Sequence, residues 1–210
     1  MLKNKLKDYI EEELANQQGS HSVEPFQIEL YKEEKSFLEK HSSIVQEIGK
    51  KVTLSEKVQD TRFNDVYIEK CNKETEDLIS EESSTFLDQQ IQYFQHHLEE
   101  FMYLESSWFD IIGVDAISFE MDSVFKTYDV MLGLKCQKKH EVKIKTFFST
   151  NLINDKRTFE VMFNANEGIW DVNFSINGIK GFKEDWTIRE AYNNVYHFLF
   201  QLREYIETEI

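Results

Sequence analysis

The sequence predicts an α+β protein, because the spacing of its apolar residues changes along the chain. Up to about residue 110 they recur every three or four positions, as along one face of a helix. From residue 126 they alternate with polar residues, as in strands with one buried face. We therefore expect a helical part over residues 1–110. Over residues 111–210 we expect a four-stranded antiparallel meander covered by a C-terminal helix. No Pro- or Gly-rich linker separates the two parts, so they can share one core.

The first two helices are predicted at the N-terminus. The buried face of the first helix would consist of Leu2, Leu6, Tyr9, Ile10 and Leu14. Gly19 suits the left-handed residue that ends many helices. Pro25 suits the first turn of a second helix, over residues 25–48, because its fixed φ is already helical. Gly49 would end this second helix.

Two further helices are expected, over residues 63–78 and 87–101. Thr85 offers an N-cap hydroxyl to the second of them, with Asp88 as its capping-box partner. The apolar seam of that helix would be Leu87, Ile91, Phe94, Leu98 and Phe101. This spacing resembles a heptad repeat, but two heptads are short for a coiled coil. Packing inside a helical bundle is the favoured interpretation, and a homodimer seam is the alternative.

Alternating residues predict four strands, over residues 128–136, 142–145, 159–163 and 170–176. The short connections between neighbouring strands favour antiparallel pairing. The final helix has a clear start, because Thr187 and Glu190 form a capping box and Trp186 can pack against Ala191. Its buried face would consist of Ala191, Val195, Phe198, Leu202 and Tyr205. Since a meander exposes one apolar face, this helix is the expected cover.

Composition limits the class of protein. The net charge is -15 and the isoelectric point about 4.8, which argues against a nucleic-acid-binding protein. The mean hydropathy is -0.53 and no apolar run reaches the length of a membrane span. The N-terminus has no apolar stretch typical of a secretory signal, so we expect a cytoplasmic protein. Cys71 and Cys136 are too few for a disulfide framework or a zinc site.

The charge distribution has one anomaly, in residues 74–125. This quarter of the chain holds thirteen of the 39 acidic residues and none of the 24 basic residues. Such a surface would steer a basic protein partner toward it, although charge runs also occur simply as solvated faces. The residues we expect to bind the partner are Glu74, Glu76, Asp77, Glu81, Glu82, Asp88, Glu99, Glu100, Glu105 and Asp110.

Sequence motifs for catalysis are absent: there is no nucleophile elbow, phosphate-binding loop, dinucleotide fingerprint or zinc-protease motif. We therefore expect no catalytic residue and no cofactor. The predicted function is a cytoplasmic, non-enzymatic interaction protein, comparable to an inhibitor, an immunity protein, a secretion chaperone or a nucleic-acid mimic. One alternative is a self-associating structural protein, with residues 87–101 at a homodimer interface. Another is a metal-dependent enzyme that uses His96 or His97 with carboxylates such as Glu99 and Glu100.

Overall fold

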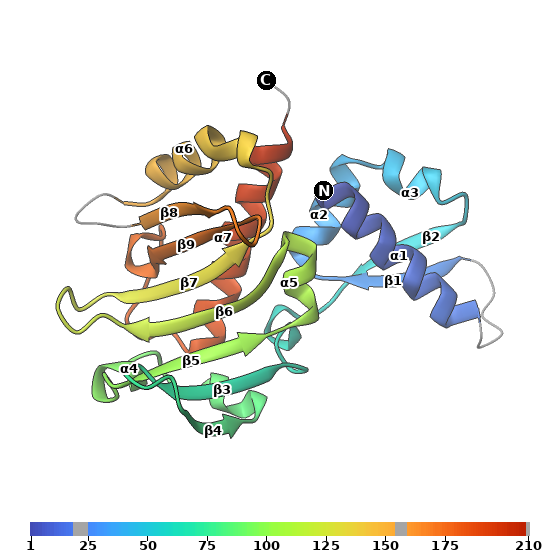
Figure 1. Ribbon diagram of the computed structural model, residues 1–210. Helices are drawn as coiled ribbons and strands as arrows, with labels where there is room; N and C mark the ends of the chain where they lie inside the picture. The colour runs from blue at the N-terminus through green and yellow to red at the C-terminus, as the bar shows by residue number, and fades with distance from the viewer. Residues whose placement is uncertain (19–24, 154–158, 209–210) are drawn as a thin grey trace. The chain divides into compact units, whose positions relative to one another are not determined.

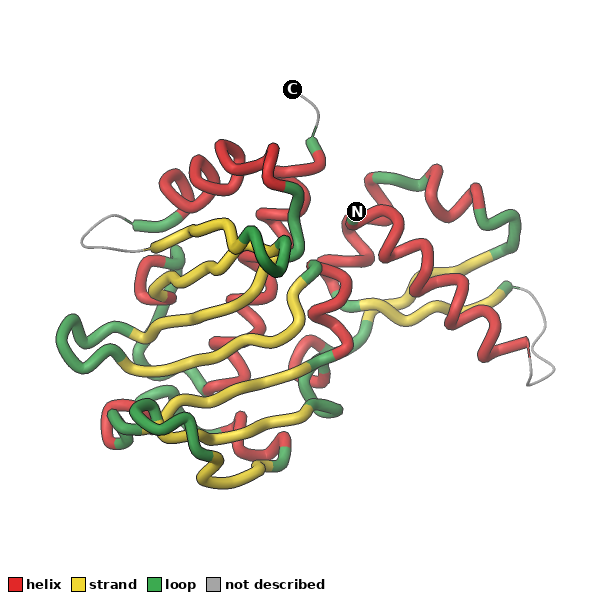
Figure 2. Tube along the Cα trace, in the orientation of Figure 1, coloured by secondary structure: helices red, strands yellow, loops and turns green. Residues whose placement is uncertain are grey.

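The computed structural model describes residues 1–18, 25–153 and 159–208. The chain divides into two compact units, Met1–Arg62 and Phe63–Ile210, which we call the N-terminal and C-terminal units. The predicted boundary near residue 110 falls inside a short helix of the C-terminal unit, between two strands that pair with each other. Figures 1 and 2 show the elements of both units.

The N-terminal unit has a small parallel sheet with helices. Its elements are α1 (Leu2–Gln18), β1 (Phe26–Leu30), α2 (Lys32–Lys40), α3 (Ser43–Glu47), β2 (Val52–Glu56) and the 3₁₀ turn η1 (Gln59–Thr61). Helix α1 is confirmed, with Leu2, Leu6, Ile10 and Leu14 buried as expected. Gly19, its expected cap, lies outside the described residues.

The prediction of a single helix over residues 25–48 is wrong. Pro25 precedes strand β1, in which Phe26, Ile28 and Leu30 are buried and the residues between them are exposed. This strand pairs in parallel with β2, and α2 and α3 form the crossover between the two strands. The single-helix prediction is wrong because Leu30 fits two patterns. It belongs to the alternation of buried and exposed residues in the strand, and it also has the spacing of the apolar residues in the helix that follows.

The C-terminal unit is built on a seven-stranded antiparallel sheet in the order β4-β3-β5-β6-β7-β9-β8. The strands are β3 (Tyr67–Asn72), β4 (Leu78–Glu82), β5 (Glu100–Glu105), β6 (Val114–Met121), β7 (Tyr128–Leu134), β8 (Phe159–Asn164) and β9 (Ile169–Ser175). The other elements are α4 (Tyr93–His96), α5 (Ser107–Ile112), α6 (Glu141–Asn151), α7 (Ile188–Glu207) and the 3₁₀ turns η2 (Ser84–Asp88), η3 (Lys138–His140) and η4 (Ile176–Gly178). The α+β class and the antiparallel sheet are confirmed, but the number of strands is seven instead of four.

Three predicted elements of this unit are wrong. Residues 63–78 contain β3 and the turn that follows it, and residues 142–145 belong to helix α6. The apparent seam over residues 87–101 is divided among η2, α4 and β5. Its backbone makes only short-range turn bonds within the segment and also bonds to a distant segment, since Ile91 N donates to Trp186 O at 2.9 Å and Ile188 N donates to Gln89 O at 2.8 Å. Ile91 is fully buried, so no helical dimer seam exists in this segment.

The covering helix α7 is confirmed. Thr187 and Glu190 form the capping box, and the rings of Tyr192 and Phe198 lie 5.9 Å and 5.4 Å from those of Phe119 and Phe174 on the sheet. In Figure 1, α7 lies behind the sheet and the opposite face of β5, β6, β7 and β9 points toward the viewer without a helix over it. Within the described residues of the C-terminal unit, the antiparallel sheet thus has one face covered by α7 and one face without a helical cover.

Candidate functional site

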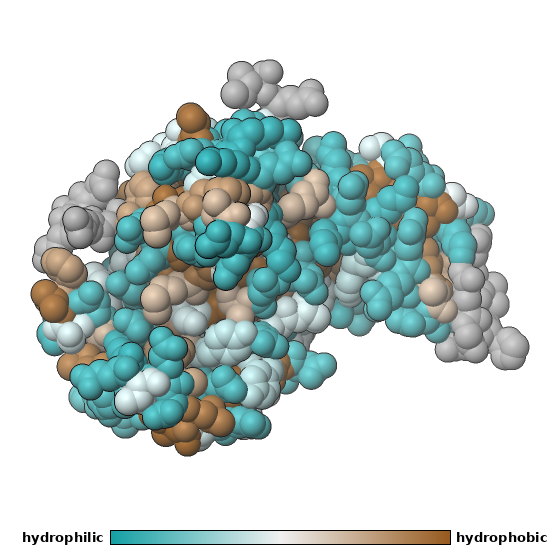
Figure 3. Space-filling view, in the orientation of Figure 1, coloured by the Kyte–Doolittle hydropathy of each residue, from teal (hydrophilic) through white to brown (hydrophobic). Residues whose placement is uncertain are grey.

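The uncovered face of the seven-stranded sheet is the candidate site, and we call it the open face. Paired residues form a row across all seven strands: Glu81, Glu69, Tyr103, Ser118, Met131, Asn173 and Glu160. A second row contains Tyr67, Glu105 and Ala116, and continues with Gly133, Asp171 and Met162. Figure 3 shows this side as mainly hydrophilic, with apolar patches between the polar side chains.

The alternation of each strand places these residues on the open face. In β7, for example, Tyr128, Val130, Leu132 and Leu134 are buried, and the residues between them are partly exposed. Successive side chains of a strand point to opposite faces, so the polar members of every strand gather on one side of the sheet.

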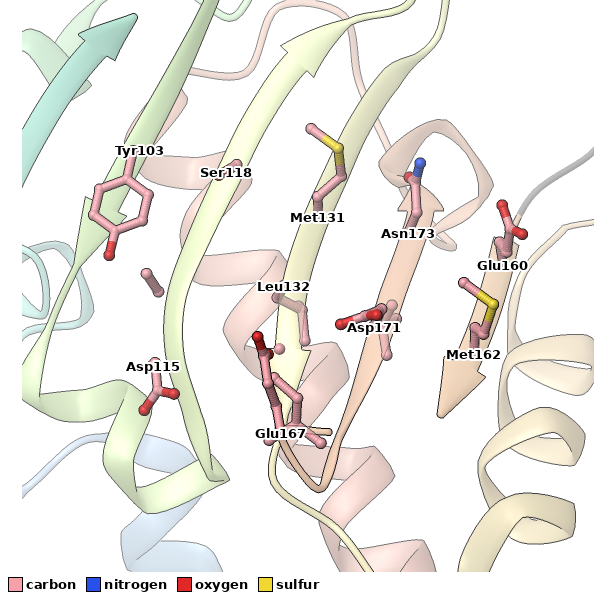
Figure 4. Close-up of a pocket in the computed structure, with 14 residues that line it drawn as sticks. Tyr103, Asp115, Ser118, Met131, Leu132, Glu160, Met162, Glu167, Asp171 and Asn173 are labelled. Atoms are coloured by element: carbon pink, nitrogen blue, oxygen red, sulfur yellow. The ribbon is translucent and has the colours of Figure 1, made fainter. Parts of the chain in front are cut away.

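A cavity of about 690 Å³ lies on the open face, and we call it the central hollow. The residues that line it come from β5, β6, β7, β8, β9 and the β8–β9 turn: Tyr103, Asp115, Ala116, Ser118, Met131, Leu132, Gly133, Glu160, Met162, Glu167, Ile169, Asp171, Val172 and Asn173. Figure 4 shows Asp115 at the start of β6 and Glu160 on β8, with Glu167 and Asp171 close together between them.

The absence of a side chain at Gly133 shapes this hollow. A Cβ atom at this position would lie only 2.9 Å from Ile169 Cδ1. The side chain of Ile169 therefore occupies the space above Gly133 and contributes apolar surface to the hollow. Ala116, two strands away from Ile169, contributes a second small residue to the lining.

A second cavity, of about 500 Å³, is lined by Asp65, Val66, Tyr67, Glu105, Ser106, Ser107, Asp110 and Asp115. We call it the lateral hollow. Asp115 lines both hollows, so the two are contiguous. Together they hold seven carboxylates: Asp65, Glu105, Asp110, Asp115, Glu160, Glu167 and Asp171.

Among the described residues, the carboxylates of these hollows have few cationic partners. Within residues 1–18, 25–153 and 159–208, the one ion pair made by the seven carboxylates joins Asp115 to Lys135. Both of these side chains are more than half exposed, and such exposed pairs contribute little to stability. The hollows thus combine apolar surface with an excess of carboxylate charge, which is complementary to a cationic ligand.

Two tyrosines extend the acidic surface between β3 and β5. Tyr67 donates a hydrogen bond to Glu69, and Tyr103 donates one to Glu105 at 2.7 Å. The hydrogen bond to Glu69 raises the pKa of Tyr67 to about 12. Burial and the bond to Glu105 raise the pKa of Tyr103 to about 12. Both tyrosines therefore stay neutral at physiological pH and present aromatic surface beside the carboxylates.

The structure distributes the predicted partner-binding residues over several places. Glu105 and Asp110 line the lateral hollow, and Glu81 lies on the open face next to Glu69. Glu74, Glu76 and Asp77 are exposed at or near the β3–β4 turn, and Glu99 is exposed at the start of the β5 region.

The remaining three predicted residues are used inside the unit. Lys70 Nζ lies 3.4 Å from Glu82 Oε1 and 3.7 Å from Glu100 Oε2. Asp88 Oδ1 accepts a hydrogen bond of 2.8 Å from Arg189 Nε on α7. Segment 74–125 therefore does not place all its charge on one surface, because part of it is bound to cations from other segments.

The sequence analysis missed Asp65, Asp115, Glu160, Glu167 and Asp171 as members of one acidic site. A signal for three of them was present. Asp171 and Glu160 are polar members of the alternating strands, and Glu167 lies in the predicted turn between those strands. Only the pairing of β9 with β7 and β8 shows that they share a surface with Asp115.

One group of metal-ligating type occurs among the described residues, formed by His97, Glu99 and Glu100. Glu100 already interacts with two other groups, since Tyr93 donates a hydrogen bond of 2.7 Å to its Oε2 and Lys70 Nζ lies 3.7 Å from the same atom. The ring of His97 stacks on Tyr93 at 4.1 Å. Because Glu100 has a cationic neighbour and the imidazole of His97 is stacked on a ring, we interpret this group as a structural network and not as a metal site. His96 is not part of this group.

Asp129 on β7 lies opposite Glu120 on β6, on the open face of the sheet. Burial, together with Asp122 and Glu120, raises the pKa of Asp129, although a hydrogen bond of 2.9 Å from Thr127 opposes the shift. Because the pKa is raised in the folded state, the native protein loses stability as the pH rises from the ordinary value toward the raised one.

The substitution Asp129→Asn should therefore stabilise the protein at pH 7, by about 0.2–1 kcal/mol, the range for side-chain pairs on neighbouring strands. The gain should shrink as the pH falls toward the ordinary pKa of aspartate, where the native carboxyl is already protonated. Urea denaturation of both proteins at pH 7 and at acidic pH measures the difference. Equal stability at pH 7 would contradict this prediction.

Comparisons with protein-family models, with curated proteins and with solved structures found no match to this chain. Fold and site define an α+β protein whose antiparallel sheet has one acidic, uncovered face. None of the described helices has the length and apolar character required to cross a membrane.

Proposed function

We propose that this chain is a non-enzymatic interaction protein that binds a basic protein partner through the open face. The observation that carries the proposal is the pair of contiguous hollows, in which seven carboxylates lie beside apolar surface at a sheet face that no described helix of the C-terminal unit covers. Cationic side chains of a partner buried there would neutralise the carboxylates, and the apolar surface would be removed from water.

We keep the sequence-based prediction of a basic partner, but we assign its binding site to a different surface. The proposed site is the open face with the adjoining lateral hollow. Glu105 and Asp110 from segment 74–125 line the lateral hollow, and Asp171 and Glu160 from strands far along the chain line the central hollow. An inhibitor, an immunity protein, a secretion chaperone or a nucleic-acid mimic would each use such a surface. The aromatic rings of Tyr67 and Tyr103 supply the anchoring side chains that interfaces favour.

The experiment compares partner capture by three forms of the full chain. The double variant Glu160→Gln with Asp171→Asn removes two charges from the central hollow. The matched control, Glu11→Gln with Glu12→Gln, removes two charges from exposed positions on α1. Each immobilised protein is exposed to cell lysate treated with nuclease, at low and at high salt, and retained proteins are quantified.

We expect a basic protein to be retained at low salt and released at high salt, because salt screens exposed charges. The hollow variant should bind that protein about tenfold or more weakly, whereas the α1 variant should bind it like the parent. Equal retention by both variants would show that only the overall charge matters and would overturn the proposal. Retention independent of salt would also overturn it.

A further inference from the structure

The central hollow runs across the strands, and this direction limits what it can hold. Its lining residues come from five adjacent strands, β5, β6, β7, β9 and β8. Neighbouring strands lie about 4.8 Å apart, so the hollow extends over about 19 Å. An extended polypeptide of about six residues covers this length at about 3.3 Å per residue.

The backbone of the occupant distinguishes an extended chain from a helix. A helix bonds its own N–H and C=O groups within itself, so it would leave the polar groups along the hollow unused. An extended chain leaves its backbone groups free to bond with the lining of the hollow.

The hollow contains both apolar and acidic groups along its length. Glu160 lies at the β8 end, Asp171 and Glu167 lie toward the middle, and Asp115 lies at the other end (Figure 4). The apolar side chains of Met131, Met162 and Ile169 lie among these carboxylates. Methionine is flexible and polarisable and adapts to varied partners.

Polar groups along the same path can bind a backbone. Ser118 and Asn173 flank Met131 in the row that crosses the sheet. The hydroxyl of Ser118 and the amide of Asn173 can both donate and accept hydrogen bonds. An extended chain needs such groups because its own N–H and C=O groups have no partners within the chain.

We infer that the central hollow binds an extended segment of the basic partner, in which Lys or Arg residues alternate with apolar residues. This inference rests on the proposed function and specifies the form of the partner. A second copy of this chain does not fit the description, because two acidic open faces would repel each other. Cationic side chains would reach Asp171, Glu160 and Asp115, and apolar side chains would contact Ile169, Met131 and Met162.

The test uses three synthetic probes with blocked ends and the full-length protein. The first is an eight-residue peptide that alternates arginine and valine, because β-branched residues favour extended chains. The second is an alanine- and leucine-rich peptide that carries the same number of arginines at helical spacing. The third is acetyl-arginine amide, which represents a small organic cation. Calorimetry gives affinities, and amide chemical shifts identify the residues that respond.

We expect the extended peptide to bind one to one, at least tenfold more tightly than the other two probes, with shifts centred on β7 and β9. Met131→Arg should abolish this binding, because it places a positive charge in the hollow. The exposed Val142 on α6 provides the control substitution, Val142→Arg, which should leave binding unchanged. If Met131→Arg fails to fold, Glu160→Gln with Asp171→Asn supplies a milder variant that should weaken binding by about tenfold.

Equal or tighter binding of the helical peptide would overturn the inference, and so would shifts outside the open face. If no probe binds but capture of a basic partner still depends on Glu160 and Asp171, the inference on the extended segment fails and the proposed function stands. If that capture is also insensitive to the two residues, the proposed function itself fails.

Discussion

Replacement of Arg62 by methionine should destabilise the N-terminal unit by about 3–5 kcal/mol, the cost of breaking a buried ion pair by removing one partner. Arg62 Nη1 donates to Glu34 Oε1 at 2.7 Å, and its Nη2 donates to Glu33 Oε2 at 2.7 Å. The side chains of Arg62 and Glu34 are fully buried. The guanidinium also lies 4.2 Å from the ring centre of Tyr31.

The large cost comes from the carboxylate that remains. Without Arg62, Glu34 would be a buried charge that has lost its bidentate partner, and water cannot replace that partner at a fully buried position. The double variant Arg62→Met with Glu34→Leu should recover much of the lost stability, since it removes both charges and leaves apolar groups of similar size.

The measurement must report on the N-terminal unit itself. All three tryptophans lie in the C-terminal unit, so tryptophan fluorescence does not report on it. Amide hydrogen exchange in β1 and β2 during urea titration provides the readout. The control is Lys35→Met, which removes the partly exposed pair with Glu56 and should cost less than about 1 kcal/mol. Similar losses in both single variants would contradict the prediction.

Replacement of Arg203 by methionine should destabilise the C-terminal unit by about 3 kcal/mol or more, because it removes several charge-assisted hydrogen bonds from a buried site. Arg203 on α7 donates to the carbonyl of Ile112, to Gly113 O at 3.1 Å and to Lys135 O at 2.9 Å. Its side chain thereby joins α7 to the end of α5 and to the end of β7.

A helix C-terminus carries unpaired carbonyls and a partial negative charge, which a cation stabilises. Gly113, in the left-handed conformation with φ of 66°, ends α5 and aims these carbonyls at Arg203. Burial lowers the pKa of Arg203 to about 10, so the guanidinium remains charged at neutral pH.

Urea denaturation followed by tryptophan fluorescence measures this effect, because Trp108 lies on α5 and Trp170 on β9. Arg203→Lys should have an intermediate effect, since an ammonium keeps the charge but cannot match the geometry of the guanidinium. Gln201→Met, at an exposed position of the same helix, should change stability by less than about 0.5 kcal/mol. A loss below about 1 kcal/mol for Arg203→Met would show that water replaces the guanidinium.

Elements with a long, regular pattern were predicted correctly. Helices α1 and α7 and strands β7, β8 and β9 bury most of the apolar residues on the expected faces, although Tyr205 of α7 is exposed. In such elements the spacing of buried residues and the geometry of the element are directly related, so the pattern is sufficient.

Short elements were predicted incorrectly from the spacing of their apolar residues. Leu87, Ile91 and Phe94 are all buried and have helical spacing, but they lie in separate turns held by backbone bonds to residues 186–188. Val142 fits an alternating pattern, but it is exposed on helix α6. In both segments, contacts with residues distant in the chain decided the conformation over local preference.

The sequence by itself determined the α+β class, the antiparallel pairing and the C-terminal covering helix, and the excess of negative charge, but the predicted four-stranded meander is wrong, because residues 142–145 are helical and β7 pairs with β9 instead of β8. It also determined which side chains of β7, β8 and β9 belong to the polar face, because alternation is a local property. Only the tertiary structure decided that Glu105, Asp115 and Asp171 share one surface, whereas Glu100 and Asp88 are held by Lys70 and Arg189. The physical reason is that strand pairing joins segments far apart in the chain, and the order and register of those pairs depend on long-range hydrogen bonds that local spacing does not encode.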